Sequence, residues 1–194
     1  RLREGVEIMR QAWTTGSATL NGQYYQVDGA RVRPLPLQEG GIPLWVAGGG
    51  EKVTLRIAAQ YAQYTNFSGM PVEFDAKSKL LKGHCDDLGT DFDAITRSAN
   101  YDTVIGSTEA EVAQRIDTLV DRIKPYIGAE RAEAFRTQSL GPNALAVGTP
   151  EQVIERLSDM KKRGMTYPIH NFPESAYDRT GVELFEREVI PALA

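Results

Sequence analysis

The chain has 194 residues, 41% of them hydrophobic and 25% charged, a balance that predicts a folded protein rather than a disordered segment. Its formal net charge of -4, with no block of Lys and Arg, argues against nucleic acid as a partner, and no apolar run approaches the roughly 20 residues of a membrane span. Cys85 is the only cysteine, which excludes an internal disulfide and favours the cytoplasm. Arg1 already lies inside a helical pattern, so we expect that further sequence precedes it.

The first quarter of the chain predicts a helix, a hairpin and a buried strand. Apolar residues at i, i+4, i+7 and i+11 indicate an amphipathic helix whose apolar face carries Leu2, Val6, Met9 and Trp13. Asn21 and Gly22 predict a two-residue hairpin turn. The apolar run at 42–47 is typical of a parallel strand buried on both faces, and it ends abruptly at three glycines.

Beyond the glycines, helical and strand patterns alternate. We expect a returning helix directly after the glycines and a short strand at 64–67. A second helix lies between Pro71 and Gly89, and it leads to a strand somewhere within 98–105.

Two capping boxes mark the helices of the second half. The boxes at 108–111 and 149–152 each place a hydroxyl and an acidic or amide side chain where they satisfy amides at a helix start. The first of these helices is expected to end near Pro125. The remaining expected elements are a short helical piece at 131–136, a turn at 141–143, a strand at 166–172 and a final helix stopped by Pro191.

Strands separated by helices indicate parallel strands joined by right-handed crossovers, so the predicted fold class is α/β. A free-standing doubly wound sheet and part of a (β/α)8 barrel share this local pattern. Periodicity alone favours neither architecture.

Gly48, Gly49 and Gly50 stand between the predicted strand and the next helix, which is the outline of an anion site. Without Cβ atoms the backbone can approach a ligand closely, and the amides and dipole of the helix start favour a phosphate. Lys52 and the hydroxyl of Thr54 add a charge and a donor. A merely tight turn is the alternative, because the spacing matches neither Gly-x-Gly-x-x-Gly nor a P-loop.

Several segments, taken in order, resemble the luciferase-like monooxygenase family. The similarity runs along essentially the whole chain, and the order and spacing of the motifs make it specific. The segments are Asn21-Gly22-x-Tyr24-Tyr25, Pro34-x-Pro36-x-Gln38, Pro43-Leu44-Trp45-Val46-Ala47-Gly48-Gly49-Gly50, Val147-Gly148-Thr149-Pro150-Glu151-x-Val153 and the closing stretch 184–193.

The resemblance implies an eight-stranded TIM (β/α)8-barrel, of which this chain would supply the C-terminal half, strands five to eight. It implies one domain over 1–194, with a hairpin insertion at 18–40 and an irregular insertion at 126–146. A flavin or deazaflavin would lie at the C-terminal mouth of the barrel, with its phosphate at the glycine turn. The expected cofactor-binding residues are Ala47, Gly48, Gly49, Gly50, Lys52, Thr54 and Asn66.

Two further residues are candidate substrate contacts. His170, near the end of the last strand, can hydrogen-bond a substrate or ring system as a neutral imidazole, and a structural histidine is the alternative. Phe67 ends the second strand, where it either lines the ring pocket or packs in the core. Gln63 stands where the family usually has Asp, so no role is carried over to that position.

Other polar residues have two interpretations each. The ligand-type run at 84–87 does not predict a metal site, because consecutive helical residues point in different directions. One of Tyr24 and Tyr25 covers the cofactor cleft or makes an ordinary hairpin contact. Arg31 and Arg33 either meet an anionic cofactor tail or stay solvated.

The family resemblance implies a hydride-transfer oxidoreductase acting on a small organic substrate. The sequence at 48–55 looks like the branch that uses coenzyme F420, whereas members that use FMN often carry Ser or Thr after Gly-Gly. The alternatives are an FMN-dependent monooxygenase and a non-enzymatic barrel fragment. Acid-base residues of the family generally lie on the early strands, so no catalytic residue is named and the chain alone is expected to be inactive. The exposed strand edges of a half barrel predict association with the missing N-terminal half or with a second copy.

Overall fold

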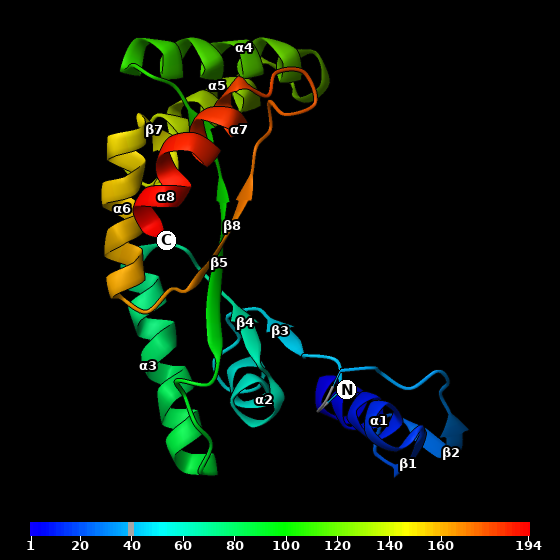
Figure 1. Cartoon of the computed structure of the whole chain (residues 1–194). Helices are drawn as coiled ribbons and strands as arrows, with labels where there is room; N and C mark the ends of the chain where they lie inside the picture. Colours follow the sequence, from blue (N-terminus) through cyan, green and yellow to red (C-terminus); the bar gives the residue numbers. More distant parts are fainter. Residues whose placement is uncertain (39–40) are drawn as a thin grey trace. The chain divides into compact units, whose positions relative to one another are not determined.

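The computed structural model describes residues 1–38 and 41–194, which form two compact units (Figure 1). The first unit comprises Arg1–Thr65 and Lys79–Thr96, and the second comprises Asn66–Ser78 and Arg97–Ala194. The predicted single domain over 1–194, with insertions at 18–40 and 126–146, stays a prediction. Residues 39–40 of the first insertion lie outside the described part of the chain.

Helices and strands alternate along the chain as predicted. The elements up to residue 95 are α1 (Leu2–Thr15), β1 (Ser17–Asn21), β2 (Gln26–Arg31), β3 (Trp45–Ala47), α2 (Thr54–Tyr61), β4 (Tyr64–Asn66) and α3 (Pro71–Leu88). Those that follow are β5 (Thr96–Asp102), β6 (Val104–Ile105), α4 (Glu109–Ile127), α5 (Ala129–Ser139), β7 (Val147–Gly148), α6 (Pro150–Lys162), β8 (Tyr167–Asn171), α7 (Thr180–Leu184), a π-helix η1 (Phe185–Val189) and α8 (Ile190–Leu193).

The strand pairings confirm the α/β class. β5 pairs in parallel with β8, β6 pairs in parallel with β7, and only the β1–β2 hairpin is antiparallel among the pairs whose register is defined. In the first unit β3 neighbours β4. The strands of residues 1–38 and 41–194 form no closed barrel, so the half-barrel expectation stays a prediction. Within these same residues, no helix has the length and apolar composition that crossing a bilayer requires.

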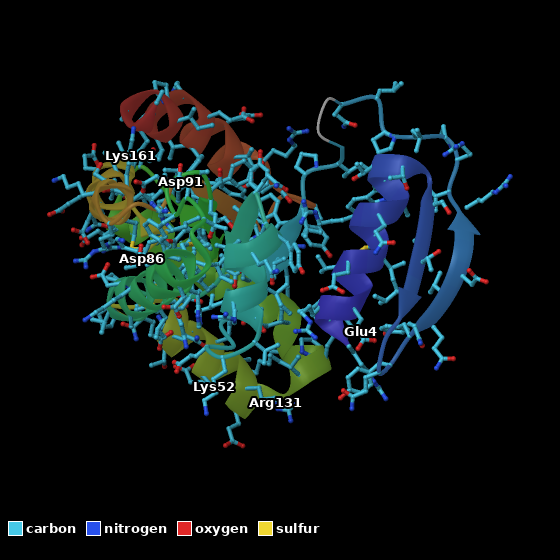
Figure 2. All side chains as sticks on the ribbon, turned by 90° about the horizontal axis from the view of Figure 1, so that it is seen from below. Glu4, Lys52, Asp86, Asp91, Arg131 and Lys161 are labelled. Atoms are coloured by element: carbon cyan, nitrogen blue, oxygen red, sulfur yellow. The ribbon has the colours of Figure 1, made fainter. Side chains whose placement is uncertain are left out.

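The turn of the β1–β2 hairpin is longer than predicted. Asn21 pairs with Gln26, so four residues connect the strands, and the Gly22 amide donates to the Tyr25 carbonyl at 2.9 Å. The cause lies in α1, where the carboxylate of Glu4 (labelled in Figure 2) accepts bonds at 3.0, 2.9 and 3.0 Å from the amides of Gln23, Tyr24 and Tyr25. The predicted two-residue turn was therefore wrong, because a helix carboxylate stabilises a wider loop that holds both tyrosines.

Helix α1 confirms the predicted helix but not its whole apolar face. Val6 is 1% exposed, whereas Leu2 and Met9 are 48% and 37% exposed. Burial raises the pKa of Glu4, but the three amide donors outweigh it and the pKa of this carboxyl is lowered. The helix is thus held to the hairpin as much by a polar contact as by its apolar face.

Strand β3 is shorter than the predicted run and is buried on one face only. Leu44 and Val46 are 8% and 5% exposed, whereas Trp45 is 39% exposed. Because side chains alternate along a strand, Trp45 and Ala47 share the open face. The prediction of a strand buried on both faces was therefore wrong.

One hydrophobic cluster of the second unit lies between α4 and the β6–β7 pair. Valine and leucine side chains of α4 pack on the strand residues Val104 and Val147. The Thr108 hydroxyl accepts from the Glu111 amide at 3.1 Å, and Glu111 accepts from the Ser107 amide at 2.8 Å, so both groups cap the helix start as predicted. The other members of this cluster are Val112, Ile116, Leu119, Val120 and Ala132.

One predicted helix end was confirmed and one was wrong. Helix α4 ends at Ile127, two residues after Pro125, and the Gly128 amide donates to the Lys124 carbonyl at 3.0 Å. The final helix, predicted to stop at Pro191, passes this residue and ends at Leu193, after the π-helical turn that precedes it. Because hydrogen bonds in a π-helical turn join residues five apart, the chain can continue as a helix although Pro191 has no backbone amide to donate.

Helices α5 and α6 were both predicted as helices, and the structure confirms both. Helix α5 is longer than the predicted piece at 131–136 and buries Ala132. Helix α6 has the predicted capping box, in which the Thr149 amide donates to the Gln152 side chain at 3.0 Å. Gly164, at φ 93°, follows the end of that helix, where a left-handed residue reverses the chain toward β8.

Candidate functional site

The glycine turn of the first unit is built so that side chains would obstruct it. Gly48 has φ 113°, a conformation that favours glycine. A Cβ at Gly50 would lie 2.7 Å from the Thr54 hydroxyl oxygen, and one at Gly48 would lie 3.6 Å from the Thr54 methyl. The Thr54 side chain therefore lies against the turn. Any residue other than glycine at position 48 or 50 would cover the backbone with its own side chain.

The turn is open to solvent and has cationic side chains near it. Ala47, Gly48, Gly50 and Lys52 are exposed, and Gly49 is half-buried. Lys52 (labelled in Figure 2) lies in the turn at 51–53, directly before α2 begins at Thr54. A cavity of about 300 Å³ in the same unit is lined by several side chains, among them Arg3, Lys52 and Arg56.

Side chains between β3 and β4 fix the strand that carries this turn. The Thr65 hydroxyl donates to the Val46 carbonyl at 2.9 Å, and the Leu44 amide donates to the Gln63 side chain at 2.8 Å. Trp45 stacks on Tyr64, with ring centroids 4.8 Å apart. Gln63, which departs from the family pattern, thus has a structural role as a hydrogen-bond acceptor.

The strand ends of the second unit carry a row of amide and carboxylate side chains. Asn66 Nδ2 donates to Ser98 Oγ at 2.8 Å and to Asn100 Oδ1 at 3.1 Å. Asn171 Nδ2 donates to Asp102 Oδ1 at 2.8 Å, and these two residues are paired in the β5–β8 register. We call Asn66, Asn100, Asp102 and Asn171 the asparagine row.

Sequence analysis found Asn66 but missed the other three members of the asparagine row. The signal was the alternation in β5, where Ser98, Asn100 and Asp102 are separated by Ala99 and Tyr101. Ala99 and Tyr101 are 0% and 7% exposed, whereas Asn100 and Asp102 are exposed. Period two therefore assigns the two polar residues to one face of the strand.

His170 and Phe67 lie among aromatic side chains. Phe67 is 6% exposed, and its ring centroid lies 5.1 Å from that of Phe74. The His170 ring lies 4.6 Å from Phe185 and 5.7 Å from Tyr101, and its Nδ1 is 2.8 Å from the Thr103 hydroxyl. Its Nε2 is buried without a hydrogen-bond partner among the described residues.

Burial shifts the titration of both polar rings in this cluster. It lowers the pKa of His170 to about 4, so the imidazole is neutral near pH 7. It also raises the pKa of Tyr101 to about 12, and the Tyr101 hydroxyl donates to the Gly69 carbonyl at 3.3 Å. Both residues are therefore neutral hydrogen-bonding groups near pH 7.

A family model described as luciferase-like monooxygenase matches residues 1–167 of the chain. The chain belongs to this family. An F420-dependent glucose-6-phosphate dehydrogenase of Nocardia farcinica (strain IFM 10152) is 27% identical over 210 residues, which cover 100% of this chain and 60% of that protein. The luciferase-like chain thus spans less than two thirds of the length of this curated relative.

Solved structures show the same fold. A coenzyme F420 dependent tetrahydromethanopterin reductase from Methanopyrus kandleri aligns with a TM-score of 0.75 at 18% identity, covering 100% of the luciferase-like chain and 63% of the reductase. An F420-dependent secondary alcohol dehydrogenase, in complex with an F420-acetone adduct, aligns with a TM-score of 0.72 at 18% identity, covering 98% and 60%. At these identities the likeness establishes the fold alone.

Residues 84–87, whose side chains are of types that bind metal ions, each have a different contact or environment. His84 Nε2 lies 2.7 Å from the Glu51 carbonyl, and Cys85 is buried. Asp86 pairs with Lys82 at 2.8 Å, and Asp87 lies 3.7 Å from Arg56. Each side chain thus has its own surroundings within the first unit.

Proposed function

We propose that this chain is the cofactor-binding C-terminal half of an F420-dependent luciferase-like oxidoreductase that transfers hydride to or from a small organic substrate. The observation that carries the proposal is the glycine turn, where Thr54 covers the place that a Cβ of Gly50 would occupy. Family membership and the names of the similar proteins support it. When bound, coenzyme F420 supplies or accepts the hydride.

The residues of the turn suit the phosphate of this cofactor. Gly48, Gly49 and Gly50 leave the backbone accessible, and the start of α2 presents amides and the positive end of the helix dipole. The hydroxyl of Thr54 adds a donor and Lys52 a positive charge. These residues would bind and orient the cofactor, with Ala47 on the open face of β3.

The other proposed contacts lie on strand ends of the second unit: Asn66 with the cofactor, and His170 and Phe67 with the substrate. Asn66 would orient the ring system through its amide, which already bonds two side chains of β5. Phe67, which is buried, and His170, which is half-buried and whose pKa is lowered to about 4, remain proposed substrate contacts with a shaping role rather than a charged one. No residue of this chain is proposed to transfer a proton.

The proposal extends to architecture, partners and compartment. The chain would supply strands five to eight of a (β/α)8 barrel, and its parallel β5–β8 and β6–β7 pairs suit that role. Open strand edges would be covered by the missing N-terminal half or by a second copy. A cytoplasmic location suits the single buried thiol of Cys85.

Cofactor titration tests the proposal. In a Trp13→Phe variant, Trp45 is the only tryptophan, and it stands three residues before Gly48. We expect saturable quenching of its fluorescence by oxidised F420 and weaker quenching by FMN. Stronger quenching by FMN would favour the flavin-dependent monooxygenase, and quenching by neither would contradict a cofactor site in this chain.

Light scattering tests the predicted association. We expect the purified chain to form dimers or larger species, because a half barrel leaves strand edges and apolar surface open. A monodisperse monomer that binds no cofactor would instead indicate a self-sufficient small domain without the proposed activity.

A further inference from the structure

The second unit contains a cavity of about 420 Å³ beside the carboxyl end of β5. Its walls come from β5, from the segment before α3, from the end of α5 and from the segment leading into β7. The volume falls within the range of small-molecule sites in proteins. Asn100 and Asp102 of the asparagine row form part of its lining.

The cavity has one polar wall and several apolar side chains. Asn100 and Asp102 face it together with the side-chain amides of Gln138 and Asn143. The apolar lining includes Met70, Phe135 and Leu145. A molecule that combines hydroxyl or carbonyl groups with a hydrocarbon part matches such a surface.

The charges of the lining residues restrict which ligands this cavity can bind. Asp102 is the only ionisable acid in the lining, and the described lining residues include no Lys, Arg or His. Arg156 of the same unit donates instead to the carbonyls of Ala144 and Val147, at 3.3 and 2.7 Å. A phosphate dianion placed in this cavity would meet a carboxylate without a compensating cation from its walls.

We propose that this cavity binds an uncharged organic substrate bearing a hydroxyl or carbonyl group, and that it disfavours phosphorylated substrates. The inference deepens the proposed function and rests on it, and it separates this chain from the relative named for glucose 6-phosphate. Asn171 donates to Asp102 Oδ1, so Asp102 Oδ2 can accept a hydrogen bond from a substrate hydroxyl. Asn66 donates to Asn100 Oδ1, so the amide hydrogens of Asn100 can donate to the oxygen of that substrate hydroxyl.

Calorimetric titration with three probes tests the selectivity, with and without oxidised F420. Glucose and cyclohexanol are the uncharged probes, and glucose 6-phosphate is the phosphorylated one. We expect at least one uncharged probe to bind about tenfold more tightly than glucose 6-phosphate, because a nearby like charge is worth roughly that factor after screening. Tighter binding of glucose 6-phosphate, or no binding of any probe, would overturn the inference.

Two variants assign the selectivity to this cavity. Asp102→Asn should raise the affinity for glucose 6-phosphate about tenfold, and it should lower the affinity for an uncharged probe whose hydroxyl donates to Asp102 Oδ2, because an amide nitrogen there cannot accept a hydrogen bond. Gln138→Lys, which adds a cation to the wall and leaves Asp102 in place, should likewise raise the affinity for glucose 6-phosphate. Asp121→Asn removes an exposed acid outside the lining and serves as the matched control. Equal effects of Asp102→Asn and Asp121→Asn would assign the selectivity to general charge rather than to the cavity.

The cofactor titration keeps the two proposals separable. If F420 does not bind but the probe selectivity and its dependence on Asp102 are found, the proposed function fails and the cavity assignment holds. If F420 binds and glucose 6-phosphate is the preferred probe, the cavity assignment fails alone.

Discussion

The glycine turn of the first unit presents polar groups of the backbone, whereas the asparagine row of the second unit presents polar groups of side chains. The turn consists of backbone, and Thr54 is the side chain that lies against it at Gly48 and Gly50. The asparagine row consists of side chains that bond one another across strands, from Asn66 to Asn100 and from Asn171 to Asp102. A site made of backbone needs only a local conformation, whereas a site made of side chains needs the strand register.

This contrast predicts different sensitivities to substitution. The strand ends rest on aromatic side chains such as the buried Phe74 and the half-buried His170, so changes in that packing should affect the stability of the second unit. The glycine turn is exposed, so changes there should affect ligand binding more than folding.

The largest expected effect is that of Phe74→Ala. The Phe74 side chain is 0% exposed and packs against Phe67, directly after the strand end that carries Asn66. Its truncation should lower the free energy of unfolding by about 3–5 kcal/mol, through lost burial and a residual cavity. Urea unfolding measures the difference, with Val72→Ala as control, since Val72 is 81% exposed on the same helix. A loss no larger than that of the control would mean that the Phe67–Phe74 contact does not support the strand ends.

The next effect is the pH dependence caused by His170. Burial lowers its pKa from 6.5 to about 4, so the folded state prefers the neutral imidazole. The resulting stability is present above pH 6.5 and is lost as the pH falls through 4, because the unfolded chain binds the proton first. The shift corresponds to at most about 3 kcal/mol between these limits.

Urea unfolding at pH 7 and at pH 4.5 measures the contribution of His170, and ring resonances followed by NMR report its titration directly. A His170→Gln variant should show a shallower decline of stability over this range. A midpoint near 6.5 in the folded protein would show that the ring is hydrated and that the strand ends are open to water.

The contrast between the two regions also explains what the sequence could predict of the fold. Capping boxes at Thr108 and Thr149 located two helix starts correctly, because a cap is decided by residues three positions apart. The hairpin turn after Asn21 was mispredicted, because its length depends on Glu4, seventeen residues earlier. The end of the last helix was mispredicted, because the helix continues through Pro191 to Leu193 after a π-helical turn.

The same distinction holds for the candidate site. The glycines at 48–50 are adjacent in sequence, so their turn could be predicted without knowledge of any pairing. Asp102 and Asn171 are separated by 69 positions, and only the parallel register of β5 and β8 brings them within 2.8 Å. The alternation in β5, which was not used in the prediction, could have identified the polar face of that strand, but not the strand that lies next to it.

The smallest expected effect on stability is that of Gly50→Ala, which tests the turn itself. The new Cβ would lie 2.7 Å from the Thr54 hydroxyl oxygen, a clash that rotation of the Thr54 side chain relieves at a cost of about 1 kcal/mol. That rotation moves the hydroxyl away from the turn, and the methyl covers the backbone where we place the phosphate. The affinity for F420 should therefore fall about tenfold while urea unfolding changes little, since 1.4 kcal/mol of binding free energy corresponds to roughly tenfold. Gly83→Ala is the matched control, because a Cβ there meets nothing within 4 Å. Equal F420 affinities of the two variants would show that the cofactor does not contact the turn. That result would contradict the proposed phosphate site in the first unit.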